Sequence, residues 1–283
     1  MKLLLMVALT MTAFAANSVL NRAALASGGI DATSFGTLRL LSGAIVLAAL
    51  VLLRQGRLSL GGPGRVAGVA GLFLYIYGFS AAYLGLPAGL GALLLFGMVQ
   101  VTMFGGSVAG GERVPARRWC GAGLAFGGLV WLLWPGGGTA PSLPHALAML
   151  LAGFGWGIYS LAGRKAEQPL VSTAANFLLA AGLGLVFLLG LMLSGSLGPW
   201  SPGAVVLAVV SGAVTSGLGY ALWYAVLPRL PGSVAAVAQL TVPVIAMAGG
   251  MVFLGEALTA RFALAALMVL GGVTVSVVPL RRG

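Results

Sequence analysis

Few residues in this chain could take part in acid–base, nucleophilic or metal chemistry. The 283 residues include four acidic side chains, one histidine and one cysteine. His145 follows Pro144 and has no second histidine with which to share a metal ion or a proton. Cys120 lies in an apolar run, and a lone cysteine excludes an internal disulfide and a cysteine metal cage. We therefore expect no enzymatic activity, no catalytic residue, no metal site and no cofactor.

Two of the acidic residues have matching surroundings. Glu112 and Glu256 each follow a glycine, and each precedes an arginine, Arg117 or Arg261, by five positions. Both lie just beyond the end of a predicted helix, where a carboxylate can pair with that arginine or cap the N-terminus of the next helix. A part in gating or in coupling is the alternative. We group these four residues with Pro243, which we expect to break the helix of the ninth apolar segment, as structural or gating residues.

Polar and aromatic side chains in the middle of apolar segments are the candidates for a binding pocket. An unpaired amide in hydrocarbon costs several kcal/mol by apolar-transfer scales, so each must face another helix or a wet cavity. Bonding between helices is the alternative to lining a pocket. Three further aromatic residues, Tyr220, Trp223 and Tyr224, are expected to be interface anchors. We predict substrate-binding roles for Asn17, Arg39, Tyr75, Tyr77, Gln100, Trp156, Tyr159, Asn176, Gln239 and Thr241.

Arg39 lies about 9 Å inside its apolar segment, at 1.5 Å per residue. Its side chain could extend back to the outer interface or pair with Asp31. The other interpretation is that it binds a substrate carboxylate or a helix end. We expect no acidic residue in the middle of any segment, which argues against carboxylate-driven proton exchange and against a site for permanently cationic drugs. A neutral or zwitterionic substrate fits better.

The segments that carry these residues are too apolar for a water-soluble protein. Hydrophobic residues make up 60% of the chain and charged residues 7%, and the mean hydropathy is +1.08. A soluble domain of this size would need a more charged exterior, so we expect a lipid bilayer crossed by helices of about 20 residues. The net charge of +11 does not indicate nucleic-acid binding, because the cations are scattered between apolar runs.

Ten apolar segments are long enough to cross a bilayer as helices, and short connections rich in glycine, proline and arginine separate them. The first segment resembles a secretory signal peptide that ends at Ala13-Phe14-Ala15. Because its apolar run continues past Ala15, we expect the segment to be retained. The predicted spans are residues 3–21, 33–53, 65–84, 88–108, 117–134, 145–164, 172–193, 203–225, 232–254 and 260–280.

The distribution of arginine and lysine predicts an orientation. Placing the N-terminus in the cytoplasm leaves Arg22 and Arg261 outside and nearly all other cations inside, which is a strong positive-inside pattern. We therefore predict a multi-pass protein of the bacterial inner membrane with both termini cytoplasmic. The cations on the inner side are Lys2, Arg54, Arg57, Arg65, Arg113, Arg117, Arg118, Arg164, Lys165, Arg229, Arg281 and Arg282.

The chain contains an internal repeat. Residues 87–135 match residues 231–279 after a gapless shift of 144 positions, at sites that include Gly111-Glu112 and Gly255-Glu256. Each copy holds five predicted spans, and because five is odd the second copy must enter the membrane upside down. Inverted repeats with a site between the halves are typical of transporters.

Two consequences follow from the repeat and from the glycines within it. We predict two five-helix domains, residues 1–140 and residues 141–283. The spacings Gly106-x3-Gly110 and Gly123-x3-Gly127 lie within the first copy of the repeat. Small residues four positions apart share one helix face, so these pairs predict close approach of a second helix.

Taken together, these motifs resemble the drug/metabolite transporter superfamily, EamA-type branch, over essentially the whole chain. The resemblance lies in Gly255-Glu256 after Pro243, in its first-half partner Gly111-Glu112 and in the Ser34-Phe35-x3-Arg39 pattern. It implies ten helices around a central cavity and the export of amino acids, metabolites or drugs. The family usually has a proline at the position of Val99 as well, so the resemblance carries over no helix break in the fourth span.

We therefore expect an inner-membrane transporter that exports or exchanges a small metabolite, an amino acid or similar zwitterion, by alternating access. A carrier of neutral metabolites such as sugars or nucleosides, or of drugs, is the alternative within transport. A non-transporting membrane subunit or a lipid-handling protein is the alternative from another class. The expected partners are a small-molecule substrate and membrane lipid. Because both inverted units lie in one chain, we expect a monomer.

Overall fold

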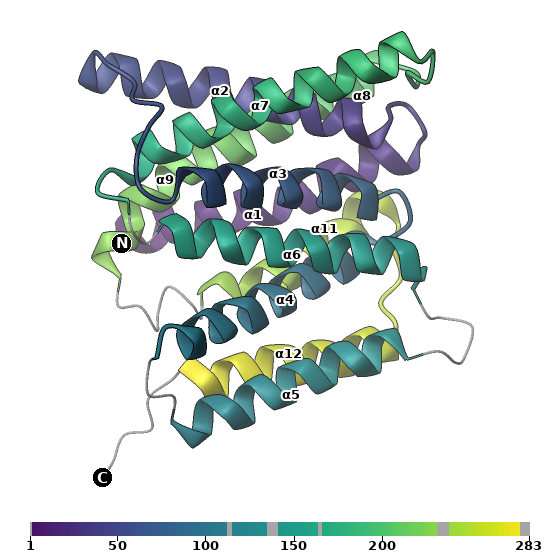
Figure 1. The fold of residues 1–283 in the computed structure, drawn as a ribbon. Helices are drawn as coiled ribbons and strands as arrows, with labels where there is room; N and C mark the ends of the chain where they lie inside the picture. Colours follow the sequence, from purple (N-terminus) through teal and green to yellow (C-terminus); the bar gives the residue numbers. More distant parts are fainter. Residues whose placement is uncertain (1, 112–114, 135–140, 164–165, 231–237, 278–283) are drawn as a thin grey trace.

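The computed structural model describes residues 2–111, 115–134, 141–163, 166–230 and 238–277. Within these ranges the chain is all-helical, with an isolated bridge between Ile30 and Trp200 but no strand, which confirms the predicted fold class. Each of the ten predicted spans overlaps a helix (Figure 1). The elements are α1 (Lys2–Ala26), α2 (Ala32–Gln55), α3 (Arg65–Ala82), α4 (Ala88–Ala109), α5 (Ala116–Leu133), α6 (Leu143–Gly163), α7 (Pro169–Leu193), α8 (Pro202–Val210), η1 (Ser211–Leu218), α9 (Gly219–Val226), η2 (Leu227–Arg229), α11 (Thr241–Leu254) and α12 (Ala260–Val277).

Seven of the described helical stretches are long and apolar enough to cross a membrane: α1 to α4, α6, α7 and the continuous stretch from α8 to η2. The helix ends follow local chemistry. The Asp31 side chain accepts a hydrogen bond from the Ser34 N–H and so caps the start of α2. At the other end, Gly56 takes the left-handed conformation, with φ of 68°, and its N–H donates to the Leu52 carbonyl.

The helices lie side by side, with α5 and α12 paired along one edge and α2 with α7 along the opposite edge (Figure 1). Between these edges, α6 packs against α3 and α4, while α1 packs against α11 and the α8–η1–α9 stretch. If each of the first five spans is exchanged for its counterpart in the second five, the α3–α6 pair becomes the pair of α1 with the α8–η1–α9 stretch, and the α4–α6 pair becomes α1–α11. The pairs α5–α12 and α2–α7 each map onto themselves. Two inverted five-helix units would give this pattern, and the division at residues 140 and 141 stays a prediction.

Pro243 interrupts the ninth span, as the sequence predicts. Ala238 and Gln239 are helical, Leu240 lies in a turn, and α11 begins at Thr241. A proline nitrogen has no hydrogen to donate to the carbonyl four residues earlier. That carbonyl belongs to Gln239, and next to it the Thr241 hydroxyl donates to the Ala238 carbonyl, at 2.7 Å. In the first half, α4 continues without a break through the corresponding position, where the residue is valine.

Glycines bring the backbones of α3 and α6 into contact. A Cβ atom added at Gly71 would lie 2.7 Å from the Gly155 carbonyl oxygen, and one added at Gly155 would lie 2.7 Å from the Gly71 carbonyl oxygen. Helices α5 and α12 meet in the same way at Gly121 and Gly272. Of the predicted glycines, Gly106 is close to α6, because a Cβ there would lie 2.6 Å from the Leu161 side chain. The predicted approach at Gly123 is wrong, because a Cβ there would meet nothing within 4 Å.

The contact between α3 and α6 predicts that Gly155→Ala destabilises the protein. The added methyl group would force two backbones apart, which we expect to cost about 1–3 kcal/mol and to lower the thermal midpoint in detergent by several degrees. The matched control is Gly190→Ala on α7, where a Cβ meets nothing within 4 Å. Alanine there should be neutral or slightly stabilising, because it favours helix. Equal midpoints for the two variants would contradict the close approach.

Candidate functional site

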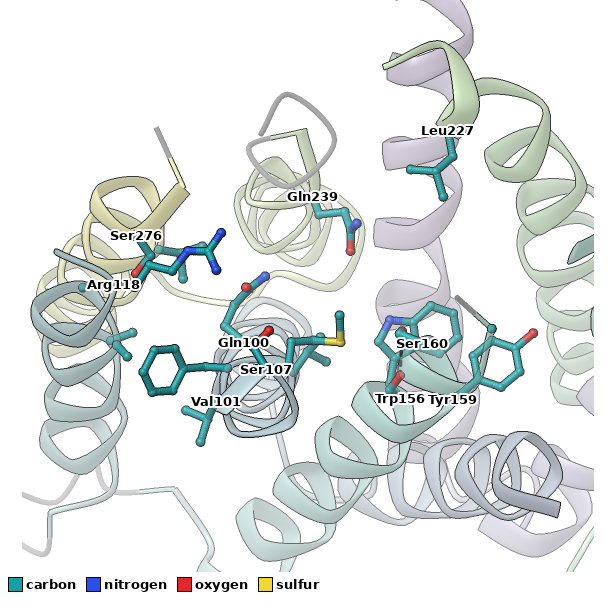
Figure 2. A pocket seen from close by; sticks show the side chains of 18 of the residues that line it. Gln100, Val101, Ser107, Arg118, Trp156, Tyr159, Ser160, Leu227, Gln239 and Ser276 are labelled. Atoms are coloured by element: carbon teal, nitrogen blue, oxygen red, sulfur yellow. Dashed lines mark hydrogen bonds between the residues drawn. The ribbon is translucent and has the colours of Figure 1, made fainter. Parts of the chain in front are cut away.

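A large cavity lies between helices of the first and the second half of the chain. Its volume is about 980 Å³, and its wall includes residues of α4, α5, α6, α9 and α12 together with Gln239. Figure 2 shows the Gln100 and Gln239 side chains directed into the space between Arg118 on one side and Trp156 and Tyr159 on the other. A cavity of this size can enclose a small organic ligand.

The mouth of the cavity lies at one end of the bundle. Its rim residues lie in the last turn of α4, at the end of α6 and after α9, or precede and begin α5 and α7. The cation distribution predicts that these connections share one side of the membrane, the cytoplasmic side. The rim residues are Ser107, Pro115, Arg117, Arg118, Gly163, Ala166, Pro169, Leu227 and Pro228.

Aromatic rings close the deep end of the cavity. Trp156 and Tyr220, with ring centroids 5.2 Å apart, line both the cavity and a second hollow of about 10 Å³ behind it. Asn17, Tyr75 and Phe79 also line this inner hollow. A space of that size holds about one water molecule. The two rings therefore separate the open cavity from a small polar interior.

Arg39 lies against this interior and is fully buried. Its Nε donates to the Ser216 hydroxyl at 3.0 Å, and its Nη2 donates to the Tyr75 hydroxyl at 2.8 Å. The guanidinium carbon lies 5.2 Å from the centroid of the Tyr75 ring and 5.0 Å from that of Phe79, which are distances at which a cation attracts a ring face. Within the described ranges, its Nη1 makes no hydrogen bond.

The structure contradicts the first interpretation of Arg39, in which its side chain extends to the interface or pairs with Asp31. The side chain has 0% exposure, so it does not extend to the interface. It does not pair with Asp31 either, because the Asp31 carboxylate accepts hydrogen bonds from the Ser34 N–H and hydroxyl. Asp31 is thus committed to capping α2. The sequence places the two residues eight positions apart but does not show which partner the carboxylate takes.

The η1 segment supplies hydroxyl groups next to Arg39. Ser211 and Thr215 donate to Oδ1 of Asn17 at 2.8 and 2.5 Å, and the Ser216 hydroxyl lies 3.5 Å from the same atom. Since Ser216 also accepts from Arg39, the network joins α1, α2 and η1 through buried polar atoms. The segment is π-helical, a form that occurs mostly as short insertions within α-helices and frequently at functional sites.

The structure brings seven of the ten predicted pocket residues into this region. Gln100, Trp156, Tyr159 and Gln239 line the large cavity. Asn17 and Tyr75 line the inner hollow beside Trp156, and Arg39 bonds Tyr75. Their predicted binding roles stay predictions.

The other three predicted pocket residues line neither space. The Tyr77 hydroxyl shares a hydrogen bond of 2.8 Å with Thr37, which joins α3 to α2. Oδ1 of Asn176 accepts from Arg65 at 2.6 Å, which joins α7 to α3. Thr241 is exposed and bonds the backbone at the proline break. Bonding within the bundle therefore accounts for these three side chains in this conformation.

Three aromatic residues of α9 line the cavity, although they were predicted to lie at the membrane interface. Tyr220 and Trp223 are buried, and both line the large cavity together with Tyr224. The expectation that they are interface anchors is wrong. Spacings of three and four residues place them on one face of a helix, and this shared face is the signal that could have identified them.

At the end opposite the mouth, a carboxylate joins three segments. Oε1 and Oε2 of Glu256 accept from the N–H of Ala88, the first residue of α4, at 3.0 and 2.8 Å. The Nε of Arg22 lies 3.5 Å from Oε1, and its Nη1 donates to the carbonyls of Tyr83 and Leu84 at 3.1 Å. The helix dipole also favours a negative charge at the start of α4. This contact joins α1 and α4 to the residues after α11, at the end of the bundle away from the mouth.

The partners of Glu256 differ from the expected ones. Its ion pair is with Arg22 of the first half, in place of Arg261 five positions on, and the helix it caps is α4 instead of the next helix. Arg261 donates to the backbone carbonyls of Trp131 and Trp134. Glu112 lies outside the described residues, so its partners stay a prediction.

Comparison with known proteins places the chain among membrane transporters. The model of the EamA-like transporter family matches residues 143–278. The chain is 48% identical to the uncharacterized protein PA1977 of Pseudomonas aeruginosa, over 98% of this chain and 94% of that protein. It is 27% identical to a protein of Salmonella typhimurium named probable amino-acid metabolite efflux pump, over 70% of each chain.

Two further matches extend this result. The chain is 29% identical to the aromatic amino acid exporter YddG of Ancylobacter novellus, over 78% of this chain and 77% of the exporter. A solved crystal structure superimposes with a TM-score of 0.63 at 22% identity and covers 95% of this chain and 97% of its own. At that identity the superposition shows a common fold only.

The contact between Arg22 and Glu256 predicts energetic coupling between the two positions. Arg22→Gln should lower the thermal midpoint by a few degrees, because it leaves a partly buried carboxylate without its cation. Glu256→Gln should change the midpoint less, because burial disfavours the charged carboxylate, and the double variant should be no less stable than Arg22→Gln. The coupling should be on the order of 1 kcal/mol, since the pair is partly buried. Additive losses in the double variant would contradict a direct interaction.

Acidic pH should remove this coupling. Burial raises the pKa of the Glu256 carboxyl, while the Ala88 N–H and Arg22 lower it by less, so it is protonated at a higher pH than an exposed glutamate. The folded protein then binds this proton more tightly than the unfolded chain, and the contribution of the group to stability decreases as the pH rises through the folded pKa. Thermal midpoints of the four proteins across an acidic pH series check this, and coupling that persists unchanged would contradict it.

Proposed function

Because this chain belongs to the EamA-like transporter family, we propose that it exports or exchanges a small amino acid or similar zwitterion across the bacterial inner membrane by alternating access. The observation that carries the proposal is the cavity of about 980 Å³ between the two halves. It opens at one end of the bundle, and the contact of Glu256 with Arg22 and Ala88 closes the other end. A carrier that alternates between two sides needs this asymmetry.

The chemistry of the cavity wall supports a zwitterion. Aromatic rings and the amides of Gln100 and Gln239 provide an apolar surface with a few hydrogen-bonding groups. The described wall contains Arg117 and Arg118 but no aspartate or glutamate, so it offers no anion to a permanently cationic drug. The names of the two relatives, an amino-acid metabolite efflux pump and an aromatic amino acid exporter, support the same substrate class.

The proposed transport cycle starts from the conformation described above, with the mouth toward the cytoplasm. A substrate enters past the rim and reaches the rings of Trp156 and Tyr220. Displacement of these rings and loss of the contact between Arg22 and Glu256 then open the other end. The inverted relation of the two halves allows the two conformations to be mirror images in their helix packing.

Reconstitution into liposomes tests this proposal. The purified protein should move at least one labelled amino acid, and Trp156→Ala should slow that flux about tenfold or more, the effect of roughly 1.4 kcal/mol of lost binding. Trp134→Ala is the matched control, because its side chain is 63% exposed and lies outside both hollows. Flux of a sugar, a nucleoside or a lipid with no flux of any amino acid would overturn the assignment.

A further inference from the structure

Arg39 brings a full positive charge into the bundle, and no carboxylate of the described residues forms an ion pair with it. The ion pair found among the described residues joins Arg22 to Glu256 and does not involve Arg39. The Asp31 carboxylate bonds Ser34. An arginine in a protein stays protonated, and an unpaired buried charge costs several kcal/mol. Ionisable residues inside membrane-spanning segments therefore mark binding sites or transport pathways.

The surroundings of Arg39 satisfy its guanidinium only in part. Ser216 and Tyr75 accept from two of its three nitrogens, and Tyr75 and Phe79 offer ring faces. All of these groups are neutral. Its Nη1 is buried and has no hydrogen-bond partner within the described part of the chain, and the same is true of the Tyr220 hydroxyl. Two buried groups able to donate hydrogen bonds thus lie beside the inner hollow without an acceptor.

The backbone around Arg39 holds it in place. A Cβ at Gly212 of η1 would collide with the Arg39 carbonyl and with the Ser42 hydroxyl, and one at Gly43 would lie 2.7 Å from the Phe177 ring. Helices α2 and η1 are therefore in backbone contact at this level. Such contact fixes the backbone that carries Arg39, while Ser216 and Tyr75 hold its guanidinium.

A short path separates Arg39 from the large cavity. Tyr75 and Phe79, against which its guanidinium packs, line the inner hollow. Trp156 and Tyr220 form the partition between this hollow and the cavity. At about 10 Å³ the hollow is too small for a substrate, so the two rings must move before a ligand can reach Arg39.

We propose that Arg39 binds the carboxylate of the substrate once Trp156 and Tyr220 move apart, with Nη1 and the Tyr220 hydroxyl as donors. A carboxylate supplies two acceptor oxygens and the missing negative charge, and its hydrogen bonds to a guanidinium are the strong kind. The rest of the substrate then lies against Trp156 and Tyr159. This proposal rests on the proposed function and narrows it to substrates with a free carboxylate.

Three probes test the proposal: phenylalanine, N-acetylphenylalanine, which keeps the carboxylate but loses the amine, and phenylalaninamide, which keeps the amine but loses the carboxylate. We expect both carboxylates to raise the thermal midpoint of the purified protein and the amide to leave it unchanged. Arg39→Gln should weaken carboxylate binding at least tenfold, and Arg39→Lys should weaken it less. Arg54→Gln, an exposed position in the last turn of the same helix, is the matched control and should bind normally.

Each outcome either supports or overturns the proposal that Arg39 binds the substrate carboxylate. If Arg39→Gln does not fold, the comparison of acid with amide on the unaltered protein and on Arg39→Lys still tests the idea. An amide that binds as tightly as the acids, a lack of binding by both acids, or a folded Arg39→Gln that keeps the preference for the acid would overturn it. Labelled phenylalanine and phenylalaninamide crossing liposomes equally well would overturn this inference alone. Carboxylate binding that depends on Arg39, without flux of any amino acid, would overturn the transport proposal instead.

Discussion

Polar groups in the interior of this apolar bundle have to find partners within the protein, because lipid offers none. Most of them do so by joining helices. Tyr77 bonds Thr37 between α3 and α2, Tyr159 bonds Thr173 between α6 and α7, and Asn17 receives the hydroxyls of η1. Among the described residues beside the cavity, Nη1 of Arg39 and the Tyr220 hydroxyl have no such partner. They lie beside the deep end of the cavity, where a ligand could take the place of the missing partner.

The two ends of the bundle differ although the two halves of the chain are related in sequence. At one end, α4 to α7, α9 and α12 border an open cavity. At the other, Glu256 binds Arg22 and the first N–H of α4. The residue that the repeat aligns with Glu256 is Glu112, which lies outside the described residues. An asymmetric conformation of a duplicated chain is what alternating access requires.

Much of this architecture could be predicted from the sequence, because apolar length and helix-breaking residues are local signals. The ten spans, the Asp31-containing connection before α2 and the break at Pro243 belong to this class. Partners could not be predicted, since they depend on which helices meet. Glu256 pairs with a residue 234 positions away in the chain (256 − 22) instead of with a neighbour, and the close glycine contact of α5 is at Gly121 instead of Gly123.

In the candidate site too, local residue type could be read from the sequence, but the partner of each side chain could not. Residue type identified Gln100, Trp156, Tyr159 and Gln239, because polar and aromatic side chains are rare in such segments. It could not separate them from Tyr77 and Asn176, which have the same chemistry but face a neighbouring helix. The π-helical form of η1 was not predictable, since no residue in Ser211–Leu218 requires it. Its consequence, three hydroxyls around Asn17, became visible only in the folded chain.

The central claim is that the cavity reaches one side of the membrane at a time. The most direct test replaces Cys120 by serine and introduces a single cysteine at Ser160 in the cavity wall or at Ser18 in the inner hollow. Labelling by a membrane-impermeant thiol reagent is then measured from each face in oriented vesicles. We predict that Ser160→Cys reacts from the face of the mouth, and that Ser18→Cys reacts from the opposite face during transport. Reaction of both cysteines from the same face, or no reaction of Ser18→Cys in a protein that transports, would contradict alternating access.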